Sequence, residues 1–127
     1  MTGPCDDGHE VLSPFCPKYQ RALEIVGRRW TGVILRFLLS GASRFNSIAQ
    51  GIPGLTDRLL SERLKELEAE GLVVRSVTPE TPVRIEYHLT PKGRALESVI
   101  RATAKWAEDW SEPSRRKQTR GTTGGKR

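Results

Sequence analysis

Hydrophobic residues repeat with helical spacing between Thr56 and Gly71. Leu60, Leu64 and Leu67 lie at positions i, i+4 and i+7, which puts them on one stripe of a helix. The polar residues of this segment that fall off the stripe are Arg58, Ser61, Glu62 and Lys65. The pattern predicts an amphipathic helix that begins near Thr56 and ends at Gly71, with one face packed and the other free.

Three helices are predicted before this segment. The first has Cys16 at or next to its N-cap and Pro17 in its first turn, and it ends at Gly27. Apolar residues between positions 30 and 38 mark the second helix, and residues 44–50 form a short third helix. The first half of the chain is therefore expected to be helical.

Two strands are predicted after the amphipathic helix. Residues 72–77 and 83–89 are rich in Val and Ile, whereas the prolines of TPETP at 78–82 cannot donate to a ladder of hydrogen bonds. Thr90 is expected to cap one final helix, with Pro91 at its first position. This part of the chain is therefore expected to form a hairpin with a looped tip, followed by a helix.

The order of these elements predicts a winged helix-turn-helix, a mainly α-helical fold with a small β wing. Residues 51–54 (GIPG) supply the turn between the short helix and the amphipathic helix. In this fold the helix after the turn enters the major groove of DNA. The free polar face of the amphipathic helix is therefore the candidate reading surface.

A second apolar stripe runs along the final helix. Its members are spaced three, four, three and four residues apart: Leu96, Val99, Thr103, Trp106 and Trp110. This spacing is typical of a helix that packs along its length against another helix, either in the same chain or in a second copy. We favour a homodimer seam shared with Leu23 of the first helix, because two tryptophans offer more apolar area than a small winged core covers.

The net charge of +6 does not describe the folded part of the chain. Residues 1–112 contain 15 basic and 15 acidic residues, so the excess lies in 113–127. We expect a flexible lead over 1–13, a domain over 14–112 and a disordered basic tail over 113–127 that either solubilises the chain or grips phosphates. No secretory signal and no apolar run of membrane-spanning length is seen, which favours a cytoplasmic protein.

The residues of the amphipathic helix that lie on or near its free face are Thr56, Asp57, Arg58, Ser61, Glu62 and Lys65. Arg58 suits a phosphate or a guanine edge, Ser61 suits a base or the backbone, and Glu62 can accept from cytosine. Thr56 and Asp57 either contact bases or cap the helix, because caps favour the same residue types. These six residues are predicted to bind DNA.

Basic and polar residues outside that helix complete the predicted DNA surface. Arg44 and Asn46, at the start of the short third helix, are candidates for holding phosphates. Arg84 on the wing is a candidate for the minor groove or a phosphate. Glu80, at the tip of the wing, argues against a purely electrostatic role for the tip.

Motifs along most of the predicted domain resemble those of HxlR-type winged helix-turn-helix transcriptional regulators of bacteria, within the MarR-like winged-helix superfamily. The matching positions are Cys16 with Pro17, Gly27 with Trp30, Arg44 with Phe45, Ile52 to Gly54, Leu64 with Leu67 and Glu68, Gly71 to Val73, Pro82, Tyr87, and Leu89 and Thr90 with Gly93. The resemblance implies a homodimer through the first and last helices that binds an inverted repeat in double-stranded promoter DNA. Some similar proteins sense quinones, aldehydes or oxidants through the cysteine at this place.

Cys16 is the candidate sensing residue. The helix dipole and the cations Lys18 and Arg21 favour its thiolate, although a small structural cysteine in a regulator controlled by an apolar ligand is the alternative. Both cysteines are expected to be reduced at rest. No cysteine follows Cys16, so its oxidation would require Cys5, a small thiol or alkylation by an electrophile.

Enzymatic and metal-binding functions find little support. The two histidines, His9 and His88, form no Ser/His/Asp arrangement, and no glycine-rich phosphate loop is present. Cys5, His9 and Cys16 lack zinc-finger spacing. We therefore expect no catalytic residue, metal or cofactor. The alternative to a DNA-binding regulator is a winged helix used as a protein-interaction module.

Overall fold

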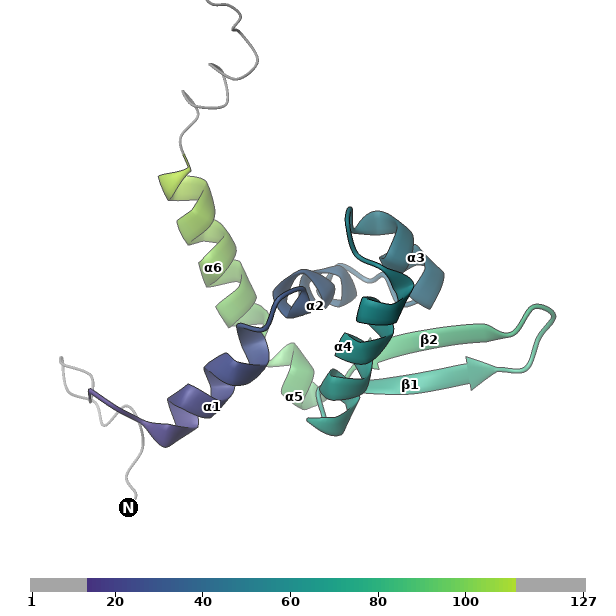
Figure 1. Cartoon of the computed structure of the whole chain (residues 1–127), viewed down its shortest axis with the longest axis horizontal. Coiled ribbons are helices and arrows are strands. Elements are labelled where there is room, and N and C mark those ends of the chain that lie inside the picture. The colour runs from purple at the N-terminus through teal and green to yellow at the C-terminus, as the bar shows by residue number, and fades with distance from the viewer. Residues whose placement is uncertain (1–13, 112–127) are drawn as a thin grey trace, which may run out of the picture. The chain divides into compact units, whose positions relative to one another are not determined.

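The structure is a computed structural model that describes residues 14–111 (Figure 1). Its elements are α1 (Pro17–Val26), α2 (Thr31–Leu39), α3 (Phe45–Gly51), α4 (Asp57–Ala69), β1 (Val73–Thr78), β2 (Arg84–Leu89), α5 (Pro91–Arg94) and α6 (Glu97–Trp110). This order confirms the predicted fold, mainly α-helical with a two-stranded wing. The predicted flexible lead and basic tail lie outside the described residues.

The chain divides into two compact units at the start of α6, between Glu97 and Ser98. The first unit contains α1 to α5 and the wing, and α6 makes up the described part of the second. None of the helices described in residues 14–111 is long and apolar enough to cross a membrane.

Local sequence signals set the ends of α1 and α2. Cys16 is the N-cap of α1, and its Sγ accepts from the backbone N–H of Tyr19 at 3.4 Å. Gly27 is the C-cap, as predicted. Trp30 is the N-cap of α2 and lies outside the helix, with a φ of 78° in the left-handed region. The chain turns sharply between the two helices at this residue.

The core of the first unit is built around α4. Leu60, Leu64 and Leu67 are all buried, which confirms the predicted stripe. The other buried apolar side chains come from α2, α3, the turn after α3 and the wing: Ile34, Leu35, Leu38, Ile48, Ile52, Leu55, Leu72, Val73 and Tyr87. Burial of one complete stripe fixes the rotation of α4 about its axis, so the opposite face must point outward.

The wing is an antiparallel hairpin joined to the segment before α3. β1 and β2 pair from Val73 opposite Leu89 to Thr78 opposite Arg84. A further antiparallel bridge joins Arg44 to Glu86, and the backbone N–H of Tyr87 donates to the carbonyl of Ser43 at 2.8 Å. The start of α3 and the wing are therefore held together.

The prediction of one final helix is wrong, because two helices follow the wing. Thr90 does cap the first of them, α5, and its Oγ1 accepts from the N–H of Gly93 at 3.0 Å. The N–H of Leu96 then bonds three residues back, to Gly93, and this tighter turn ends the helix before α6 begins. Leu96 is therefore half-buried in the turn and is not a member of the α6 stripe.

Gly93 is required where α5 meets the wing. A Cβ at this position would overlap the carbonyl oxygen of Leu72 and lie 3.0 Å from the side chain of Leu89. We expect Gly93→Ala to lower the free energy of unfolding by about 1–3 kcal/mol, since backbone must move to admit the methyl group. Gly32→Ala in α2 is the matched control, because nothing lies within 4 Å of its Cβ position. Denaturant melts that show equal losses for the two variants would contradict this packing.

Candidate nucleic-acid interface

The face of α4 opposite the leucine stripe is exposed and polar. Arg58, whose side chain is 88% exposed, lies on this face with Glu62 and Lys65, while Ser61 is half-buried at its edge. Arg58 Nε lies 3.4 Å from a carboxylate oxygen of Glu62, one turn along the helix. The face therefore offers hydrogen-bond donors and acceptors together.

Thr56 acts as the N-cap of α4. Its Oγ1 accepts from the backbone N–H of Leu59 at 3.1 Å, which satisfies one of the free donors of the first turn. Asp57, exposed in that turn, carries a negative charge near the positive end of the helix dipole. Of the two roles that the sequence allowed for Thr56, the structure supplies the cap.

The structure brings Arg44, Asn46 and Arg84 together around one surface pocket of about 310 Å³. These residues come from the start of α3 and from the wing, about forty positions apart in the chain, and the bridge between Arg44 and Glu86 explains their approach. Ser47 and Gln50 line the same pocket. The two groups of phosphate-binding candidates outside α4 therefore form one polar surface.

Carboxylates accompany the arginines of this surface. Arg84 Nη2 lies 3.0 Å from a Glu80 oxygen, and Arg84 Nη1 lies 3.9 Å from Glu86. Glu86 also lies 3.9 Å from Arg44 Nε and 3.5 Å from Nε2 of His88. The sequence drew attention to Glu80 but not to Glu86, whose approach to Arg44 depends on the fold.

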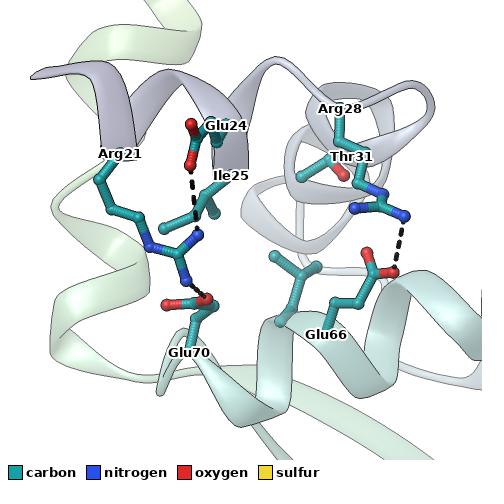
Figure 2. Close-up of a pocket in the computed structure, with 8 residues that line it drawn as sticks. Arg21, Glu24, Ile25, Arg28, Thr31, Glu66 and Glu70 are labelled. Carbon is teal, nitrogen blue, oxygen red and sulfur yellow. Dashed lines mark hydrogen bonds and ion pairs between the residues drawn. The ribbon is translucent and has the colours of Figure 1, made fainter.

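The other end of α4 is tied to α1 by ion pairs around a cavity of about 90 Å³ (Figure 2). Arg21 of α1 reaches Glu70 and also pairs with Glu24 at 3.6 Å. Arg28, just after α1, pairs with Glu66 at 3.3 Å. Since α1 has no buried residue, these ion pairs contribute directly to the attachment of α1 to α4. The glutamates at the end of α4 thus have partners within the chain.

A largely buried arginine, Arg63, strengthens this attachment. Arg63 Nε donates to the carbonyl oxygen of Arg29 at 2.9 Å, and its Nη1 lies 3.3 Å from Glu66. The side chain is only 12% exposed. Arg63 therefore serves the packing of α4 against the turn after α1 and is not available on the polar face.

Exposed apolar side chains form a stripe along α1. Tyr19 and Leu23 of α1 are four residues apart and exposed, and Phe15, which lies just before the helix, is exposed as well. Of these residues only Leu23 was predicted to lie at an interface, although the four-residue spacing of Tyr19 and Leu23 is typical of one helix face. Together they leave one side of α1 unusually apolar for a surface helix.

In α6 the predicted stripe is exposed along its whole length. Trp106 is 66% and Trp110 73% exposed, and Val99 is also exposed. Thr103 donates its hydroxyl to the carbonyl of Val99 at 2.8 Å, which satisfies the one polar group of the stripe within its own helix. The stripe is therefore an apolar surface.

Cys16 is disulfide-bonded in the structure and half-buried. The structure thus presents the oxidised form, whereas both cysteines were expected to be reduced at rest. The sequence has one other cysteine, Cys5, which lies outside the described residues. The sulfur that caps α1 is therefore engaged in a disulfide in this structure.

Comparison with known proteins identifies the family. A family model described as HxlR-like helix-turn-helix matches residues 25–115. The chain belongs to this family. It is a transcriptional regulator of the helix-turn-helix type, which agrees with the resemblance found in its motifs.

Two relatives from Bacillus subtilis (strain 168) cover most of the chain. The uncharacterized HTH-type transcriptional regulator YvaP is 51% identical over 102 residues, which span 80% of this chain and 94% of YvaP. The HTH-type transcriptional regulator YodB is 45% identical over 98 residues, 77% of this chain and 88% of YodB.

Solved structures of YodB and of the redox regulator HypR share the fold. Reduced YodB from B. subtilis matches with a TM-score of 0.67 and 44% identity over 78% of this chain and 97% of YodB. Quinone-bound YodB from B. subtilis matches with a TM-score of 0.65 and 38% identity, covering 76% and 100%. The redox regulator HypR in its oxidised form matches with a TM-score of 0.71 and 35% identity, covering 76% and 99%. The fold is thus shared with proteins solved in different redox and ligand states.

Proposed function

We propose that this regulator binds an inverted repeat in double-stranded promoter DNA as a homodimer and represses transcription in the cytoplasm. The observation that carries the proposal is the orientation of α4, whose leucine stripe is buried and whose polar face is exposed. A helix presented in this way after a helix-turn-helix turn fits the major groove. The relatives named as transcriptional regulators support the same function.

Each candidate residue then has a role in the complex. Arg58, Ser61 and Glu62 read base edges near the start of α4, where Asp57 and Thr56 set the first turn. The side chains that hold the DNA backbone are Lys65, Arg44, Asn46 and Arg84. Sequence preference therefore resides in α4, and affinity for all sequences resides mainly in α3 and the wing.

The apolar stripes of α1 and α6 support the dimer. The proposed seam contains Leu23, Val99, Thr103, Trp106 and Trp110, with Leu96 at its edge, and we add Phe15 and Tyr19. A twofold dimer uses the same surface on both copies, so each copy presents one α4 to one half of an inverted repeat. Apolar helix faces are typical of such obligate interfaces.

Cys16 is proposed as the site through which repression is released. The redox and quinone-bound states of the solved relatives support thiol oxidation or alkylation by a small electrophile. Oxidant-sensing regulators that resemble this chain often pair that cysteine with one near the C-terminus of the partner subunit, whereas no cysteine follows Cys16 here. The two alternatives are an apolar ligand between the first and last helices, and a winged helix that serves as a protein-interaction module.

We expect the protein to sediment as a dimer at micromolar concentration. Replacing Trp106 and Trp110 by Gln should give monomers and lower DNA affinity, because the seam loses its largest apolar side chains. Val74→Thr with Val77→Thr, at exposed positions of β1, is the control and should remain dimeric. A monomeric wild type in sedimentation velocity would contradict the dimer.

Arg58→Ala and Arg84→Ala should weaken DNA binding in different ways. Loss of Arg58 should cost about 1–3 kcal/mol and relax preference at one base position in each half-site, whereas loss of Arg84 should weaken all sequences evenly. Arg94→Ala is the control, since Arg94 is exposed on α5 and α5 contacts the far end of α4 through Lys92 and Glu70. Shift assays on the gene's own upstream DNA, with single-base variants of the protected site, measure both effects. If Arg58→Ala and Arg84→Ala lose affinity alike for every sequence, the assignment of reading to α4 is wrong.

Treatment of the reduced wild type with diamide or a quinone should release it from its DNA. Cys16→Ser should stay bound under the same treatment, because it lacks the reacting sulfur. Cys5→Ser tests whether the second thiol closes a disulfide or whether alkylation suffices. Equal release of wild type and Cys16→Ser would remove Cys16 from the sensing role and favour an apolar ligand.

A further inference from the structure

Arg84 is held by carboxylates of its own wing. Its Nη2 donates to both carboxylate oxygens of Glu80, at 3.0 and 3.2 Å, and its Nη1 lies 3.9 Å from Glu86. Its Nε is buried and, within the described residues, has no hydrogen-bond partner. The guanidinium is thus engaged mainly through one of its nitrogens.

A DNA phosphate that binds Nη2 of Arg84 would compete with Glu80 for that donor. Carboxylates and phosphates both bind guanidinium groups through charge-assisted hydrogen bonds. Arg84 lines the pocket shared with Arg44 and Asn46, and its side chain is 35% exposed. An incoming phosphate therefore meets an arginine whose charge is already compensated.

Glu80 is more able to leave Arg84 than Glu86 is. Glu80 lies in the turn that connects the two strands, and its side chain is 45% exposed. Glu86 lies within β2, and its side chain is 21% exposed. Glu86 also lies near Arg44 and His88, so its position is fixed by several neighbours. An exposed ion pair such as that of Glu80 is weak, and a stronger anion can replace it.

We propose that Glu80 is an intramolecular competitor of the DNA backbone for Arg84, and that it limits the affinity of the wing for any sequence. This proposal rests on the proposed DNA-binding function and adds a residue that acts against it. When Arg84 contacts a phosphate, the Glu80 carboxylate is either displaced or remains close by. In both cases its negative charge then attracts a cation from solution. The cation released from the phosphate is therefore offset by the cation attracted to Glu80, and the net number of released cations is small.

The salt dependence of binding makes the proposal measurable. Each phosphate neutralised by a free cation contributes about −0.9 to the slope of log K against log salt. In the wild type the Arg84 contact should contribute little to this slope, because a carboxylate compensates it. In Glu80→Gln the same contact should contribute its full share, once for each protomer.

The experiment compares wild type, Glu80→Gln, Arg84→Ala and the double variant as full-length proteins. Binding to the upstream duplex and to a scrambled duplex is measured over a series of KCl concentrations. Glu80→Gln should bind both duplexes about two- to fivefold more tightly per protomer, the range of a weak surface ion pair. Its slope should steepen by about 0.9 per protomer. Adding Arg84→Ala should cancel both gains.

Glu68→Gln is the matched control, because it removes the same charge from an exposed position on the C-terminal half of α4. The proposal is overturned if Glu80→Gln leaves the slope unchanged, if its gain survives Arg84→Ala, or if Glu68→Gln gains as much. Weaker binding by Glu80→Gln would also overturn it, since Glu80 would then position Arg84 for DNA. If neither the wild type nor any variant binds either duplex, the proposed function itself fails.

Discussion

Burial of the leucine stripe of α4 is the constraint on which the candidate site depends. Leu60, Leu64 and Leu67 pack into the core of the first unit. Burial of this stripe leaves the polar face of the same helix exposed. Full burial of one leucine side chain contributes on the order of 1.5–3 kcal/mol, far more than any exposed ion pair on the opposite face. The core therefore sets where Arg58 and its neighbours point, and the charges adjust to it.

Several arginines of the candidate site are paired with carboxylates of the same chain. Arg58 pairs with Glu62 and Arg84 with Glu80, so two arginines proposed to hold DNA also contact glutamates. The described residues 14–111 contain 15 basic and 11 acidic residues, so their excess of positive charge is small. In such a protein, specificity depends on the placement of individual donors and acceptors more than on net charge.

The sequence was sufficient for features with a local cause and insufficient for those that depend on contacts across the chain. The extent of α4 followed from leucine spacing and from its boundary residues Thr56 and Gly71. The break between α5 and α6 was missed because Ala95 and Leu96 are both good helix formers, and only the hydrogen bond to Gly93 reveals the turn. The sequence did not predict the ion pairs between α1 and α4 or the carboxylates of the wing pocket. These interactions join segments that are distant in the chain, so no local pattern indicates them.

Footprinting on the upstream DNA of the gene tests the central claim most directly, because it reports the symmetry of the complex as well as its existence. We predict two protected half-sites related by a dyad, with centres about 10 base pairs or a multiple of that apart, as two copies of α4 in successive major grooves require. A single protected segment without a dyad would contradict the dimeric reading of an inverted repeat. Absence of protection at concentrations where the protein is dimeric would contradict DNA binding at this site and favour the interaction module.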